Sequence, residues 1–232
     1  MVETVENRQK DDIMESELGK FKKRLQADTG MSKEYYAVVK KRFSHSSDVS
    51  KKAFNKFVPN DSVIDSNYTG TPHYDPFAKK VSMHYGADFC DPRGQGDTFF
   101  HEHGHMIDDL AGNLSGNPDF YNSLQKEKSE FVANLIKTNG MKIDEAYRYI
   151  ESQLSDVRQH SAVSDIFNGL SAGRIKGCGY HDDDYWTTKR VAQEAFAHMF
   201  EAQSDKIRYA EMQKYFPKSL KLFEDMLGGA IK

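Results

Sequence analysis

Apolar side chains recur at helical spacing through the first quarter of the chain. This period predicts a helix from Asp12 to about Gln26, with an apolar face made of Ile13, Leu18, Phe21 and Leu25. The runs "MSKEYYAVVKKRF" and "SDVSKKAFNKF" predict two more short helices, the second starting at a Ser47 or Asp48 cap. These helices are basic and amphipathic, and the dozen residues before them are expected to be disordered. We interpret residues 1–58 as a helical lead-in to the main domain.

The pattern changes near Pro59, where turn-forming residues replace the helical period. The stretch "NDSVIDSNYTGTPHYDPF" is rich in turn residues. The stretch "KKVSMHYGA" then alternates between polar and apolar positions, which places Val81, Met83 and Tyr85 on one side. This alternation predicts one strand of a small sheet.

The rest of the chain is helical in pattern, apart from one loop. Asp97 or Thr98 can cap a helix that Gly112 or Gly116 can end. Further helical periods cover residues 119–138, 143–157, 187–202 and 205–215, and a last helix starts at Pro217. Between them, "GLSAGRIKGCGYHDDDYW" is a glycine-rich loop. The expected fold class is α+β, mostly helical with one small sheet.

The amino-acid composition excludes several classes of protein. Among 232 residues, 38% are apolar and 12% aromatic, which is enough for a substantial core. A net charge of −3 gives no basic excess, so nucleic-acid binding is not expected. The first twenty residues lack the apolar segment of a Sec signal peptide, and no stretch is apolar enough to span a membrane. We therefore expect a cytoplasmic protein, or one delivered by a phage or toxin route that needs no such signal.

Metal-ligating residues concentrate in "FFHEHGHMIDDLAG". His101, Glu102 and His105 spell H-E-x-x-H, and in a helix the two histidines lie about 40° apart and one turn along, so both can reach one ion. Glu102 lies beside them, where it can take a proton from water. His103 points away and is expected to be structural or solvent-facing. Cys90 and Cys178 form no C-x-x-C pair, so His and carboxylates would hold the metal.

Two acids follow the motif at i+3 and i+4 from His105. Asp108 and Asp109 can accept the second imidazole N–H and fix the ligand tautomer, or they can form a solvated helix end. A tetrahedral zinc site also needs a third protein ligand. Position 111 is Ala, so no third histidine follows closely. In "QEAFAHMFEAQ", one helical face carries three candidates for this third ligand: Glu194, His198 and Glu201.

The segments "HEHGHMIDDLAG" and "EAFAHMFEAQSD…QKYFPKSLKLFEDML" resemble the catalytic domain of anthrax lethal factor and its relatives. That family shows H-E-F-G-H with a D-D-x-A-G-like tail, then E-x-F-A-E-x-F on a later helix. The segment "SDIFNGLSAGRIKGCGYHDDDYW" resembles the related domains of phage head-morphogenesis proteins. The resemblance covers about residues 60–232. It implies that residues 59–232 form a zincin-like metallopeptidase domain with its small sheet near the H-E-x-x-H helix.

The resemblance also implies particular site residues. Glu194 takes the position of the third zinc ligand, and His198 replaces the family's second glutamate. A tyrosine shortly before that ligand stabilises the oxyanion in such enzymes. Tyr185 is the nearest match, with His181 and Tyr180 as alternatives. The acidic run at residues 181–184 could hold a second cation, although an exposed acidic turn is the simpler interpretation.

The expected function is zinc-dependent hydrolysis of peptide bonds, with Glu102 as general base. The partner is then a protein or peptide substrate in extended conformation, held by main-chain bonds at the strand edge. The alternative is a non-catalytic, zinc-stabilised structural or interaction module of a phage head-associated protein. A toxin that acts on one host protein would share the chemistry and differ in its target. The oligomeric state is not predicted.

Overall fold

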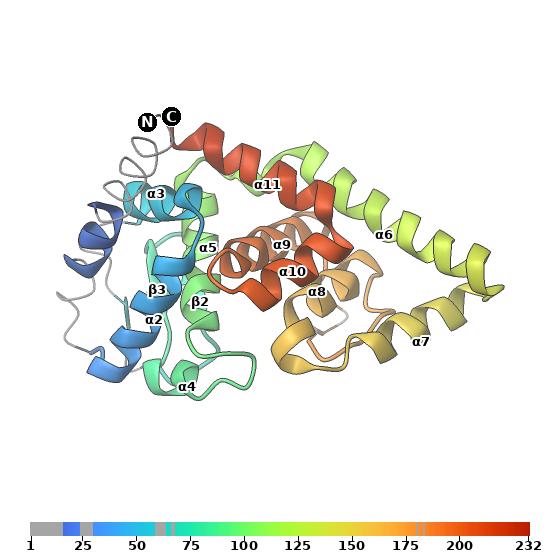
Figure 1. The fold of residues 1–232 in the computed structure, drawn as a ribbon, viewed down its shortest axis with the longest axis horizontal. Helices are drawn as coiled ribbons and strands as arrows, with labels where there is room; N and C mark the ends of the chain where they lie inside the picture. The colour runs from blue at the N-terminus through green and yellow to red at the C-terminus, as the bar shows by residue number, and fades with distance from the viewer. Residues whose placement is uncertain (1–15, 24–29, 59–63, 66–67, 180, 183) are drawn as a thin grey trace, which may run out of the picture.

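The computed structural model describes residues 16–23, 30–58, 64–65, 68–179, 181–182 and 184–232 (Figure 1). Residues 16–23 are helical. The helices that follow are α2 (Lys33–His45), α3 (Asp48–Phe57), α4 (Tyr85–Phe89), α5 (Asp97–Leu110), α6 (Pro118–Asn139), α7 (Ile143–Gln153), α8 (Val157–Leu170), α9 (Thr188–Ala202), α10 (Lys206–Tyr215) and α11 (Pro217–Ala230), with a 3-10 turn at Leu114–Gly116. The strands are β1 (Ile64–Asp65), β2 (His73–Asp75) and β3 (Lys80–Ser82). The described chain is thus mostly helical with one small sheet, as expected for an α+β protein.

The sheet has the strand order β1-β3-β2, so β2 lies at an edge. β3 pairs in parallel with β1 and antiparallel with β2. The predicted strand is confirmed at Val81, which is fully buried, but β3 ends at Ser82. The prediction that Tyr85 continues the strand is wrong, because Nδ1 of His84 accepts from the backbone N–H of Ala87 and thereby caps α4. Tyr85 is nevertheless buried in the core.

α5 and α9 form the most extensive helix pair in the described chain, and they cross closely at Gly104. A Cβ at Gly104 would lie 2.9 Å from the Cα and 3.1 Å from the carbonyl oxygen of Ala197. A side chain at position 104 would therefore force the two backbones apart. Figure 1 shows this pair at the centre of the molecule, with the sheet on the far side of α5.

The described helices of the N-terminal segment share the core of the remainder. Phe21, Phe43 and Phe54 belong to the same buried cluster as Phe99 of α5. The rings of Phe21 and Phe43 stack with their centroids 3.8 Å apart, and the ring centroid of Phe54 lies 6.1 Å from that of Phe99. α3 also packs on α5 and α11. The division at residue 58 stays a prediction, but residues 16–23 and 30–58 help to hold α5 in place.

Two helix starts differ from their predictions. α5 begins after Gly96, whose φ of 83° is left-handed, and neither Asp97 nor Thr98 caps it. A residue outside the helix caps it instead: the side chain of Asp88, in α4, accepts from the backbone N–H of Thr98 at 2.9 Å. α8 was not predicted from the sequence, although Asp156 caps it by accepting from the backbone N–H of Gln159 at 2.9 Å.

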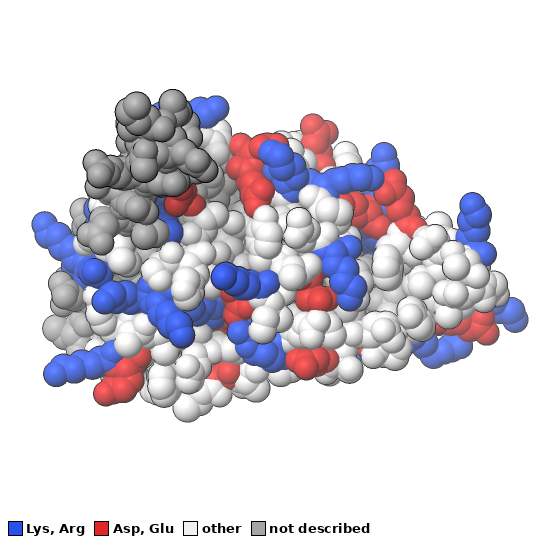
Figure 2. All heavy atoms as spheres, viewed as in Figure 1, with Lys and Arg blue, Asp and Glu red and all other residues white. Residues whose placement is uncertain are grey.

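Most other helices lie close to their predicted ranges, and α5 ends at Leu110, before Gly112 with its φ of 96°. Figure 1 also shows α6 and α7 extending together away from the body. Acidic and basic side chains are interspersed over the helices on the right of Figure 2, whereas basic side chains gather around α2 on the left. In the described part of the chain, no helix is long and apolar enough to cross a bilayer.

Candidate metal centre

Three side-chain atoms from two helices lie close together, each within 3.4 Å of the other two. Nε2 of His101 lies 3.2 Å from Nε2 of His105. Oε2 of Glu194 lies 3.2 Å from Nε2 of His101 and 3.4 Å from Nε2 of His105. The histidines occupy consecutive turns of α5, and Glu194 comes from α9. The fold therefore brings together the three residues that were predicted as metal ligands.

The spacing of these atoms suits a tetrahedral metal ion. Zinc binds histidine nitrogen and carboxylate oxygen at about 2.0–2.1 Å, so two ligand atoms of a tetrahedral site stand about 3.3 Å apart. The three separations lie between 3.2 and 3.4 Å. Two imidazoles and one carboxylate are also a donor set that zinc accepts, with a fourth position left for a reactant. The residues present therefore fit a zinc ion.

Two other groups of potential ligand atoms lie close together in the described chain: His101, Glu194 and His198, and Asp165, His181 and Glu194. Their additional members are already paired with protein groups. His198 places Nδ1 3.2 Å from Glu201 and Nε2 3.2 Å from Asp165. Nδ1 of His181 donates to Asp165 at 2.9 Å. Among the described residues, His105 pairs with no carboxylate other than Glu194, so it completes the site better than His198 or His181.

The charges at this centre favour a cation. Burial would raise the pKa of Glu194, but the facing His105 and His101 rings hold that pKa well below its usual range. The carboxylate is therefore ionised at neutral pH. Burial and the adjacent His198 act to lower the pKa of His101, but the carboxylates of Glu194 and Glu201 outweigh them and raise it to about 9. A metal ion that binds here must displace a proton from His101.

Glu102 follows His101 on α5 and faces the same cleft. It is 7% exposed and lines the two cavities that His101 and Glu194 also line. His103 lies on the other side of the helix, with its ring 4.2 Å from that of Phe99. Its Nδ1 donates to the Phe99 carbonyl oxygen at 2.7 Å, and its side chain is buried. The structural role predicted for His103 is confirmed, and the solvent-facing alternative is wrong.

Asp108 and Asp109 hold protein groups rather than the His105 ring. Asp108 is buried and accepts from the backbone N–H of Ser115 at 2.7 Å and from its hydroxyl at 2.5 Å. Asp109 accepts from the Tyr74 hydroxyl at 2.6 Å and from Lys79 at 2.5 Å. Neither acid has the predicted contact with the imidazole. Asp109 instead ties the edge strand β2 to α5, which sets the width of the cleft between them.

Tyr185 lies directly beside the third ligand. Its hydroxyl donates to Oε1 of Glu194 at 2.5 Å, while the other carboxylate oxygen faces the histidines. Burial raises the pKa of Tyr185, and the charge of Glu194 raises it further, so the hydroxyl keeps its proton. Arg190 packs on the Tyr185 ring at 4.5 Å and donates to its carbonyl oxygen. The structure therefore places a proton donor next to the candidate metal ligands.

His181 stacks on Tyr185, with ring centroids 4.0 Å apart. Asp165 holds its Nδ1, and the ring lines both cavities of the cleft. Because a carboxylate can only accept, Nδ1 of His181 carries the proton of this pair. Tyr180, the other predicted alternative, lies outside the described residues. Among the described residues, no potential metal-binding group includes Asp182 or Asp184.

A cleft runs along α5 past these residues. A central cavity of about 270 Å³ surrounds His101, Glu102 and Glu194, and it opens into a wider one of about 730 Å³. One wall of the wider cavity is the segment 71–76, which contains the edge strand β2. The other wall includes Tyr185, Lys189, Arg190 and Gln193. Among the described strands, the outer edge of β2 has no strand partner, so an extended chain could lie beside it.

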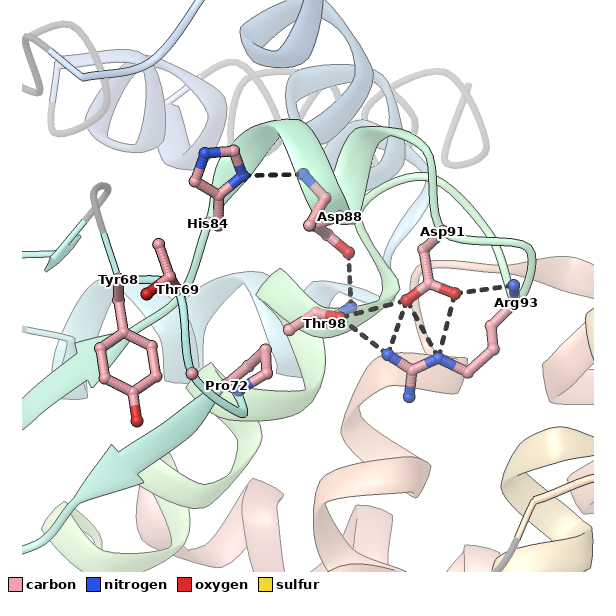
Figure 3. Close-up of a pocket in the computed structure, with 10 residues that line it drawn as sticks. Tyr68, Thr69, Pro72, His84, Asp88, Asp91, Arg93 and Thr98 are labelled. Atoms are coloured by element: carbon pink, nitrogen blue, oxygen red, sulfur yellow. Dashed lines mark hydrogen bonds and ion pairs between the residues drawn. The ribbon is translucent and has the colours of Figure 1, made fainter.

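An apolar pocket of about 450 Å³ continues the cleft on the Thr98 side (Figure 3). It shares Pro72, Arg93 and Thr98 with the central cavity. Figure 3 shows Tyr68 and Pro72 on one side of it, with Asp91 and Arg93 on the other. Its charged groups already have partners, because Arg93 donates to Oδ1 and Oδ2 of Asp91 through Nε and Nη2, and Asp88 accepts from the backbone N–H of Thr98. An occupant would thus meet mostly carbon surface and polar groups already engaged.

Two residues near the centre were not predicted from the sequence: Asp165, which contacts His181 and His198, and Arg208, which pairs with Glu201. Asp165 is 4% exposed on α8, where the neighbouring Ala162, Val163, Ile166 and Phe167 are buried. An acid on such a face is a signal that could have identified it. Arg208 is 1% exposed and carries no comparable signal, because it follows a loop and its helix has little apolar pattern.

Comparison of the chain with models of protein families, with curated proteins and with solved structures gives no match. The chemistry of the centre therefore rests on the distances, burial and charges described above.

Gly104→Ala should weaken both the fold and the metal centre. The new methyl group would press on the Ala197 backbone, and overpacking of this kind costs about 1–3 kcal/mol of unfolding free energy. Because Ala197 lies on α9 close to Glu194, the displacement should also lower zinc affinity. Urea denaturation and chelator competition would measure the two effects.

Gly228→Ala is the matched control, since a Cβ there meets nothing within 4 Å and the residue lies within α11. It should be neutral, or stabilising by up to about 1 kcal/mol. Equal zinc affinity in the Gly104→Ala variant and the wild type would show that the close crossing does not position Glu194.

Proposed function

We propose that this protein is a zinc-dependent endopeptidase with a zincin-like arrangement of its site. The observation that carries the proposal is the triangle of His101, His105 and Glu194 atoms, with Glu102 in the same open cleft. The resemblance to lethal factor-like peptidases supports it through the same residues. The antiparallel edge strand beside the motif helix supports it as well, because such an edge can pair with a substrate backbone.

The side chains divide the chemistry between them. Zinc, when bound, supplies Lewis-acid chemistry, which polarises a carbonyl group and lowers the pKa of water. His101, His105 and Glu194 hold the ion. Glu102 takes a proton from the attacking water on its carboxylate and delivers it to the leaving amine. To act on the substrate, the Tyr185 hydroxyl turns from Glu194 and donates to the oxyanion that develops there. His181, stacked on the Tyr185 ring, is the second donor through a protonated Nε2, because the effect of burial is outweighed by Asp165, which raises the pKa of the His181 ring.

The cleft suits an extended peptide rather than a compact small molecule. A chain paired with β2 advances about 3.4 Å per residue, and Thr98 precedes His101 by about 4.5 Å along α5. The apolar pocket therefore lies about one or two residues from the bond to be cleaved. The wider cavity, at the other end of the cleft, carries a positive charge on one wall. Lys79 neutralises Asp109 there, and the exposed Lys189 and Arg190 supply the excess positive charge. This arrangement favours a large apolar side chain on one side of the bond and an acidic one on the other.

Cleavage of a random decapeptide library by the zinc-loaded protein tests the proposal. We expect hydrolysis that a chelator stops and added zinc restores. The cleavage sites should share a large apolar residue at one fixed position, because that residue fills the pocket of Figure 3.

Zinc bound at one equivalent without any hydrolysis would contradict the endopeptidase proposal. That result would favour the alternative, a structural or interaction module in which the metal only stabilises the fold. Hydrolysis without any shared apolar position would leave the activity in place and remove the role of the pocket.

A further inference from the structure

The His101 ring contacts a carboxylate at each of its two nitrogens. Its Nε2 faces Glu194 in the candidate metal site, and its Nδ1 faces Glu201. Oε2 of Glu201 lies 3.4 Å from Nδ1 of His101. Both residues are buried, and Glu201 is only 1% exposed. The two nitrogens of the ring therefore face two carboxylates of α9, Glu194 at Nε2 and Glu201 at Nδ1. This explains why Glu201 is not the third ligand, since it lies behind the ring.

The spacing along α9 produces this arrangement. Glu201 lies seven positions after Glu194, which amounts to almost two full helical turns, so both acids project from the same side of the helix. The close crossing at Gly104 then brings that side against α5. One helix thus presents one acid to the metal-facing edge of His101 and another to its rear edge.

Nδ1 of His101 needs an acceptor. A ring that binds a metal through Nε2 carries its proton on Nδ1, and an acceptor there fixes the tautomer and the ring orientation. Nδ1 is buried, and no group in the described chain makes a well-formed hydrogen bond to it. A buried N–H without an acceptor costs about 1–3 kcal/mol. Glu201 lies only slightly beyond hydrogen-bond length, so a small movement of the ring on metal binding closes the contact.

Buried, polar side chains contact the Glu201 carboxylate on two sides. Its Oε1 pairs with Arg208 at 3.0 Å, and Arg208 also pairs with Asp97 at 2.7 Å. Arg42 pairs with Asp97 from α2. On the other side, Nδ1 of His198 lies 3.2 Å from Oε2 of Glu201. These buried charges restrict where the carboxylate can lie and keep it beside Nδ1 of His101.

We propose that Glu201 is the positioning residue of the metal centre, which fixes the tautomer and orientation of His101, and that Arg208 holds Glu201 for this purpose. The proposal rests on the proposed metal site but not on peptide hydrolysis. It also accounts for His198, which stands where lethal factor-like peptidases have a glutamate. In this chain the carboxylate comes from the next turn of α9, and His198 pairs with it rather than replacing it.

The test is the zinc affinity of Glu201→Gln, measured by competition with a chromophoric chelator. Loss of a carboxylate that orients a metal-binding histidine lowers affinity by about 10–100-fold. The visible spectrum of the cobalt-loaded variant should also change, because the His101 ring is less well oriented.

Glu127→Gln is the matched control. Glu127 is 5% exposed and accepts three hydrogen bonds at the start of α11, from Lys218 N and from the Ser219 N–H and hydroxyl. This variant should lose stability, as any buried carboxylate variant does, yet keep wild-type zinc affinity and cobalt spectrum. Zinc affinity of Glu201→Gln within about threefold of wild type would overturn the proposal.

A second measurement needs no variant, in case Glu201→Gln does not fold. In the zinc-loaded wild type, ¹⁵N-edited NMR should find a slowly exchanging, downfield proton on Nδ1 of His101. A rapidly exchanging Nδ1 proton, or metal bound through Nδ1, would overturn the proposal. Neither measurement depends on hydrolysis, so an inactive protein that binds zinc would refute the endopeptidase and still test Glu201.

Discussion

Glu102→Gln should lower kcat for peptide hydrolysis by about 10²–10⁴-fold, which is the contribution of a general base. The amide has nearly the same shape as the carboxylate but cannot accept the proton. Zinc should remain bound at one equivalent, because the proposed ligands are His101, His105 and Glu194, and Glu102 is not one of them. The measurement is steady-state hydrolysis of one peptide chosen from the library, with metal content determined on the same sample.

The control for this variant is Glu130→Gln. Glu130 lies on α6, is about half exposed and pairs with Lys218 at 3.1 Å, outside the cleft. It should have wild-type kcat and metal content. If Glu102→Gln hydrolyses the peptide as fast as the wild type does, Glu102 is not the base and the proposed division of roles fails. If it loses zinc as well, the result reports on the metal site and not on proton transfer.

Glu194→Gln should reduce zinc affinity by more than about 100-fold. Outer partners of metal ligands typically contribute about 10–100-fold, and a direct ligand contributes more. The substitution removes the charge that faces both histidines while keeping an oxygen that can accept from Tyr185. Chelator competition and metal analysis would measure the loss, and activity should fall with metal occupancy.

The Glu127→Gln control separates this loss from a general effect of removing a buried carboxylate. It should bind zinc normally despite lower stability, since Glu127 lies against the start of α11. Wild-type affinity in Glu194→Gln would contradict the ligand set. In that case His198, whose ring lies 4.4 Å from that of His101, would become the candidate third ligand.

Much of the architecture follows from local patterns along the chain. Apolar periods predicted most of the helices within a few residues, because each helix buries one stripe of side chains and its period survives in the sequence. The strand around Val81 was predicted for the same reason, by alternation. α8 was missed although Ser155 and Asp156 precede it, because four of its buried positions are polar and interrupt the apolar pattern: Ser161, Ser164, Asp165 and Asn168.

Several site residues could also be predicted. The pair His101 and His105 depends only on the geometry of one helix, so the sequence suffices for it. Glu194 was placed by resemblance, because the residues alone left His198 and Glu201 as equal candidates. The positions of Asp108 and Asp109 were misjudged, because their partners Ser115 and Tyr74 are tertiary contacts that the helix itself does not reveal.

The sequence by itself therefore determined that one helix presents two imidazoles and an acid on a shared face. Helical geometry needs no distant partner, so this result holds whatever the rest of the chain does. The residues by themselves left open which acid of α9 faces the histidines and which lies at the other edge of His101, and the tertiary structure decides it. That choice depends on how closely α5 and α9 cross at Gly104, and on the buried Arg208 that holds Glu201. Both are contacts between residues far apart along the chain, and local pattern carries no record of them.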